Sequence, residues 1–131
     1  MTKPTSLTSQ DERVLYEAGY LLLKRGKIKA AREVFEGLIA MTPAKSLPYS
    51  FLGNTYFAEL KFDDAINAHR KALELDSNNF LSMAHLGEAL LASKKREEGL
   101  SILKKVVSLD PNGASGGYAK SLLEVAEAGV L

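Results

Sequence analysis

The chain has 131 residues, with 46% apolar residues, 25% charged residues and no cysteine, as is typical of one soluble globular domain without disulfides or thiolate metal sites. Its 17 basic and 16 acidic residues leave a formal net charge of +1. This balance argues against nucleic acid or an anionic membrane surface as the partner, because both require a concentrated positive field.

The first ten residues are polar and include Pro4, so we expect residues 1–10 to form a flexible N-terminal arm. This segment lacks the apolar centre of a secretory signal. No apolar stretch approaches the roughly 18 residues of a membrane span. We therefore expect no membrane insertion, and a soluble protein in the cytoplasm.

A first pair of helices follows the arm. Ser9 or Asp11 is placed to cap a helix that runs to about Lys24, and Gly26 to end it in a left-handed turn. A second helix is predicted over residues 28–41, with its apolar residues on one side. These residues are Ile28, Ala31, Val34, Phe35, Leu38 and Ile39.

Two more pairs and a final helix complete the chain. The second pair is predicted over residues 46–59 and 62–75, and the third over residues 80–93 and 96–109. Glycines and small polar residues predict a flexible turn at 112–117. A capping helix is expected within residues 114–131, where Tyr118, Leu122, Val125 and Ala126 recur at helical spacing.

One pattern recurs along the chain at a fixed interval. Gly19, Gly53 and Gly87 are spaced by 34 residues, and so are Ala31, Ala65 and Gly99. The most regular unit places Tyr49, Leu52 and Tyr56 around its glycine.

This 34-residue pattern resembles the tetratricopeptide (TPR) repeat. The resemblance implies an all-α fold of three tandem helix-turn-helix repeats plus the capping helix, in a right-handed superhelical solenoid. The repeats would cover residues 11–111, with units at about 12–45, 46–79 and 80–113.

Two positions depart from the repeat. The apolar residue at Phe35 and Leu103 is replaced in the middle unit by His69, which we interpret as a boundary histidine with satisfied hydrogen bonds. Gly99 replaces a small alanine, at a cost of about 1 kcal/mol in a helix interior. The third unit is therefore either packed very closely at Gly99 or the softest of the three.

The first helix of each pair is apolar over more of its circumference than the core of the pair requires. The additional residues fall on a separate stripe, and the TPR resemblance places it on the concave side of the stack. We interpret this stripe as a partner-binding groove. Its residues are Tyr16, Tyr20, Leu23, Leu47, Phe51, Asn54, Phe57, Leu81, His85, Glu88 and Leu91.

Three roles for this stripe remain open. A contiguous exposed apolar patch usually marks an interaction site, so the stripe could bind a partner or a second copy of the chain in a homodimer. It could instead be core between adjacent repeats. Either terminal segment could also fold back and cover part of it.

Some TPR domains hold the C-terminal carboxylate of a peptide with lysine, asparagine and arginine side chains. We match those positions to Tyr16, Tyr20, Phe51, Leu81 and His85, none of which supplies that chemistry. The groove is therefore expected to take an extended apolar segment of a protein or peptide.

Catalytic and metal-binding patterns are absent from the sequence. His69 and His85 are 16 residues apart, without metal-ligand spacing. The acidic pairs at 63–64 and 97–98 each open a helix, where the helix dipole explains them. No phosphate loop or catalytic triad is visible. We expect no enzyme activity, no cofactor and no metal site.

A narrower resemblance concerns the first and third units. Residues 15–20, 26–35 and 85–91 are similar to the repeats of the type III secretion chaperones that hold hydrophobic translocator proteins. This resemblance implies a chaperone whose groove binds an extended client segment. The alternative is a scaffold or adaptor subunit whose same surface is buried in a larger assembly.

Overall fold

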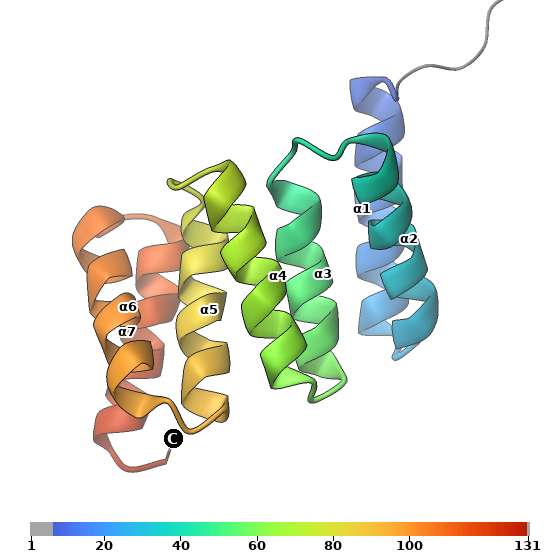
Figure 1. The fold of residues 1–131 in the computed structure, drawn as a ribbon. Coiled ribbons are helices and arrows are strands. Elements are labelled where there is room, and N and C mark those ends of the chain that lie inside the picture. Colours follow the sequence, from blue (N-terminus) through green and yellow to red (C-terminus); the bar gives the residue numbers. More distant parts are fainter. Residues whose placement is uncertain (1–6, 131) are drawn as a thin grey trace, which may run out of the picture.

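The computed structural model describes residues 7–130, which form helices and no strand (Figure 1). The all-α prediction is confirmed. Of the N-terminal arm expected over residues 1–10, residues 1–6 lie outside the described residues. The first helix begins at Ser9. The helices are α1 (Ser9–Lys24), α2 (Ile28–Met41), α3 (Leu47–Ala58), α4 (Phe62–Leu75), α5 (Phe80–Ala92), α6 (Arg96–Leu109) and α7 (Ala114–Glu127).

Consecutive helices pack against one another along the whole chain, so the molecule is a stack of helical hairpins. Figure 1 shows α1 and α2 at one end of the stack and α6 and α7 at the other. In addition, α3 contacts α5, and α5 contacts α7. The first helices of successive hairpins therefore share one face of the stack, and α7 extends that face beyond the third hairpin.

The repeated glycines mark where the two helices of each hairpin come closest. A Cβ atom added at Gly19 would lie 2.5 Å from the ring of Phe35. At Gly53 it would lie 2.5 Å from Nε2 of His69, and at Gly87 2.6 Å from a methyl group of Leu103. No side chain fits at those distances, so the glycine interval reflects the close approach of the helices.

The turn inside each hairpin uses a left-handed residue at the same repeat position. Gly26, Leu60 and Lys94 have φ angles of 76°, 62° and 68°. The turn predicted at Gly26 is confirmed. The other two hairpins adopt this conformation without glycine, at a cost on the order of 1 kcal/mol each.

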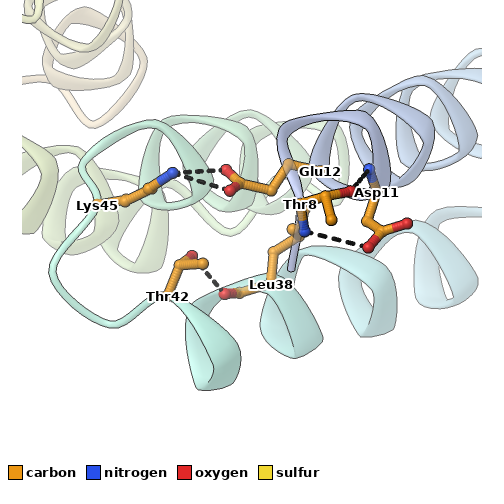
Figure 2. Close-up of polar contacts among 6 residues, drawn as sticks. All are labelled: Thr8, Asp11, Glu12, Leu38, Thr42 and Lys45. Atoms are coloured by element: carbon orange, nitrogen blue, oxygen red, sulfur yellow. Dashed lines mark hydrogen bonds and ion pairs between the residues drawn. The ribbon is translucent and has the colours of Figure 1, made fainter. Parts of the chain in front are cut away.

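The N-terminus of α1 is capped by Thr8, and the prediction of Ser9 is wrong. The Asp11 amide donates to Thr8 Oγ1 at 3.0 Å, and the Thr8 amide donates to Asp11 Oδ2 at 3.1 Å (Figure 2). Asp11 thus takes part from inside the helix, in a reciprocal capping box. Figure 2 also shows Lys45 donating to both carboxylate oxygens of Glu12, which ties α1 to the loop before α3.

The flexible turn predicted at 112–117 is wrong from Ala114 onward, because α7 begins there. The Gly116 amide donates to Asp110 Oδ2 at 3.1 Å, and a Cβ at Gly116 would lie 1.7 Å from the carbonyl oxygen of Asp110. Gly116 is needed here for the close packing of the first turn of α7 on the preceding loop.

Gly99 also serves close packing. A Cβ there would lie 3.0 Å from the Gly87 carbonyl oxygen and 3.1 Å from Leu91 Cγ. Of the two alternatives for the third hairpin, the structure shows the tightly packed one.

Candidate partner-binding groove

The predicted groove residues all lie on α1, α3 and α5, the helices that share one face. Tyr20 and Leu47 are the most exposed of them, at 50% and 41%. Every other one except Leu91 is half-buried. The structure therefore places the stripe at a surface, with most of its side chains partly supported by neighbours.

Leu91 is the exception, and its expected place in the groove is not observed. Its side chain is 8% exposed and belongs to the core formed with α6 and α7. The physical reason lies in α6, where Gly99 has no side chain and Leu91 occupies the space beside it. Leu91 is a core residue and is not available to a partner.

The amino-terminal part of this face, which we call the aromatic half, contains Tyr16, Tyr20 and Phe51. The rings of Tyr16 and Phe51 have centroids 5.2 Å apart, and the Phe51 ring stacks on Phe35 at the same distance. Tyr16 and Phe51 therefore join the first two hairpins as well as reaching the surface. The Lys24 ammonium lies 5.5 Å from the centroid of the Tyr20 ring.

The carboxy-terminal part, the polar half, is hollowed between α3, α5 and α7. A depression of about 310 Å³ is lined by Asn54, Phe57, His85, Glu88 and Tyr118. A second depression, of about 190 Å³, lies beside it and shares His85 and Tyr118. Its remaining lining residues are Leu81, Ala84, Ala114 and Ser115.

Tyr118 lines both depressions, although the sequence pattern predicted for it only a place in the capping helix. A signal for it was present, because Tyr118 follows Tyr16 by three intervals of 34 residues. In that register α7 is the first helix of a fourth unit, and its inner face continues the stripe.

Glu88 is the polar centre of this half. Its Oε1 lies 3.1 Å from His85 Nδ1, and its Oε2 accepts a hydrogen bond of 2.6 Å from the Tyr118 hydroxyl. Burial would raise the pKa of Glu88, but the hydrogen bonds from His85 and Tyr118 outweigh it and hold the pKa below its usual value. Burial and the bond to Glu88 raise the pKa of Tyr118. Near neutral pH, Glu88 is therefore a carboxylate and Tyr118 its donor.

Beneath this surface lies His69, which is only 1% exposed. The description of it as a boundary residue is wrong, although its hydrogen bond is satisfied. Its Nδ1 lies 2.9 Å from Ser82 Oγ, which lies 2.6 Å from Ser50 Oγ. The Asn79 side-chain amide donates to Ser50 Oγ at 2.8 Å. A sequence pattern of single small polar residues gave no sign that these side chains would meet.

His69 is also connected to the groove. Its ring stacks on that of His85, with centroids 5.9 Å apart and an angle of 17° between the planes. Burial, with a smaller contribution from His85, lowers the pKa of His69 to about 3. The buried imidazole is thus neutral near pH 7 and supports a groove residue from below.

Two further positions bear on the carboxylate clamp, because Asn54 and Glu88 follow Tyr20 by one and two intervals of 34 residues. Asn54 does supply an amide. Glu88 places a negative charge on the same face, and a negative charge repels a peptide carboxylate.

Two further properties concern residues 7–130. No cluster of three or more histidine or acidic side chains there has the arrangement of a metal site. None of the helices in that range has the length and apolarity to span a membrane.

Known proteins share this architecture. The first TPR domain of Spaghetti (RPAP3), solved with the HSP90 peptide SRMEEVD, has a TM-score of 0.79 at 25% identity over 95% of this chain and 98% of its own. The Yersinia enterocolitica type III secretion translocator chaperone SycD has a TM-score of 0.81 at 24% identity, over 90% and 91%, which shows the fold alone.

Among curated sequences, the TPR repeat-containing protein YpiA of Bacillus subtilis is 25% identical over 101 residues, or 77% of this chain. The chain spans about a quarter of the length of YpiA, since the match covers 24% of it. Tetratricopeptide repeat families match residues 12–45 and 56–124. The second match alone covers more than half of the chain, which therefore belongs to the tetratricopeptide repeat family.

Proposed function

We propose that this chain is a non-catalytic protein-binding module that holds an extended apolar segment of a partner across α1, α3, α5 and α7. The observation that carries the proposal is the shared face of these helices. It combines the exposed Tyr20 and Leu47 with two adjoining depressions at its other end.

The energy available is sufficient for such a ligand. Burial of a large side chain contributes roughly 1.5–3 kcal/mol, and ordering a disordered segment costs roughly 2–5 kcal/mol. Two or three apolar anchors on this face would therefore offset the ordering cost.

Within this function, we propose a role like that of the type III secretion chaperones that hold hydrophobic translocator proteins. The support is the similarity of fold to SycD together with the apolar character of the aromatic half. The alternative is an adaptor subunit with the same face buried in an assembly. Spaghetti, whose TPR domain was solved with an HSP90 peptide, illustrates peptide binding by the same fold.

Selection of binders from a random peptide library, displayed on phage, tests the binding function directly. Tyr20 and Leu21 form a matched pair, because both are 50% exposed but point about 100° apart around α1. We expect selected peptides to be rich in apolar residues and to bind Tyr20→Ser at least tenfold more weakly. Their affinity for Leu21→Ser should equal that for the unaltered chain. Equal losses in the two variants would contradict the assignment of the groove.

Phe51 is less suitable for this test. Its ring contacts both Phe35 and Tyr16, so a polar substitution would weaken the junction of two hairpins together with any binding.

Light scattering of the isolated chain separates the two roles. A chaperone that awaits its client should be a soluble monomer or a defined dimer. An adaptor subunit without its assembly should associate through the uncovered face, and Tyr20→Ser should reduce that association.

A further inference from the structure

We infer that the larger depression of the polar half is a subsite for a cationic side chain, lysine or arginine, of the bound segment. The inference rests on the proposed function and specifies part of the ligand: a segment that is apolar over the aromatic half and carries a positive charge over α5 and α7.

The lining of the depression fits a cation. Its five residues supply one carboxylate, at Glu88, and no lysine or arginine. Asn54 adds an amide whose oxygen is an acceptor. Phe57 and Tyr118 contribute aromatic rings, which attract lysine and arginine through their π-electron faces.

Glu88 has acceptor capacity left. Each of its oxygens takes one hydrogen bond within the protein, from His85 and from Tyr118. A carboxylate offers about four lone-pair sites, so both oxygens can accept another donor. The Glu88 side chain is 20% exposed, which leaves it open to a ligand but partly removed from water. Partial removal from water strengthens an ion pair.

At the opposite end of the face, a cation of the protein already lies against an aromatic ring. Lys24 lies over the Tyr20 ring and occupies the cation position there. A second cation is disfavoured beside it, whereas Glu88 attracts one. Glu88 and Lys24 together therefore favour a segment whose cationic residue lies at the α5–α7 end.

N-acetylarginine methylamide is a suitable probe, with the neutral isostere N-acetylcitrulline methylamide as its control. In NMR titrations, we expect the arginine probe to cause saturable shifts of the Asn54, Phe57 and Tyr118 resonances. The citrulline probe should bind at least fivefold more weakly. Equal affinities for the two probes would overturn the inference.

Variants locate the subsite. Glu88→Gln should weaken arginine binding at least fivefold, whereas Glu33→Gln, at an exposed position on α2, should not change it. If Glu88→Gln alters the fold, as judged by circular dichroism, Phe57→Leu is a second variant that should weaken arginine binding. Undiminished binding of the arginine probe in both folded variants would contradict the subsite.

Failure of the cationic subsite can be distinguished from failure of the proposed function. Library peptides whose binding depends on Tyr20, but which gain nothing from a lysine or arginine, would remove the subsite and leave the groove. Loss of the Tyr20 dependence would remove the groove itself.

Discussion

The junction between the first two hairpins and the junction between the second and third solve the same packing problem with different chemistry. At the first, Phe35 covers Gly19 and stacks on Phe51. At the second, the equivalent residue is His69, which covers Gly53 and is connected by hydrogen bonds to the next hairpin.

The difference shows what the repeat requires and what it leaves free. Close approach of two helices at a glycine is common to the two hairpins that supply Phe35 and His69. The filling residue can be aromatic or a buried neutral imidazole, but the imidazole depends on its partners, because an unsatisfied buried polar group is costly. The aromatic junction should therefore tolerate change and acid better than the polar one.

Substitution at Gly53 should have the largest effect. A Cβ at this position meets His69 Nε2 at 2.5 Å, so Gly53→Ala should reduce the free energy of unfolding by about 3 kcal/mol. Gly37, in the middle of α2, has open space around its Cβ position, and Gly37→Ala should stabilise by about 1 kcal/mol. Urea unfolding measures both. The same sign for both alanines would refute the close-approach account.

Loss of the hydroxyl at Ser82 should have the next largest effect. Ser82→Ala leaves His69 Nδ1 without its partner, at a cost of about 2 kcal/mol. Ser101, exposed on α6, is the matched control and should change the free energy of unfolding by less than about 0.5 kcal/mol. Similar values for Ser82→Ala and Ser101→Ala would mean that the polar junction does not depend on this hydrogen bond.

Acid should weaken the polar junction selectively. The folded pKa of His69 is about 3 and its ordinary value is 6.5, so between these values the unfolded chain binds more protons and stability falls with falling pH. The loss due to His69 from pH 7 to pH 5.5 should be about 1 kcal/mol. The stability that Glu88 contributes through its lowered pKa is lost only as pH falls further, through that folded pKa.

His69→Phe, which copies the first junction, tests this prediction. Urea unfolding at pH 7 and pH 5.5 should show a smaller pH dependence in the variant, by about 1 kcal/mol. An unchanged dependence would show that His69 is not the group responsible.

The turns within the second and third hairpins should show the smallest effects. Leu60→Gly and Lys94→Gly relieve left-handed strain and should stabilise by about 0.5 kcal/mol each. Arg25→Gly is the control, since Arg25 has φ −87° and gains nothing from glycine. If thermal unfolding shows the same change in stability for all three variants, the role of backbone conformation is contradicted.

Much of the fold could be predicted, because a fixed glycine interval and one-sided helices determine hairpins of defined register. The site was harder to predict. The sequence pattern placed Leu91 in the stripe, yet its side chain packs in the core, in the space that Gly99 leaves free. His69 looked like a boundary residue, yet its environment is set by Ser82 on another hairpin. Tyr118 could be assigned to this face only if α7 is recognised as the first helix of a fourth repeat unit. In each case the decisive contact comes from a residue elsewhere in the stack.

Backbone chemical-shift mapping with a library-selected peptide tests the central claim most directly. We predict that the largest shifts fall on the shared face of α1, α3, α5 and α7, around Tyr20, Asn54 and Glu88. Largest shifts on the exposed surface of α2, α4 or α6, for example at Glu33 or Lys71, would contradict the assignment of the groove.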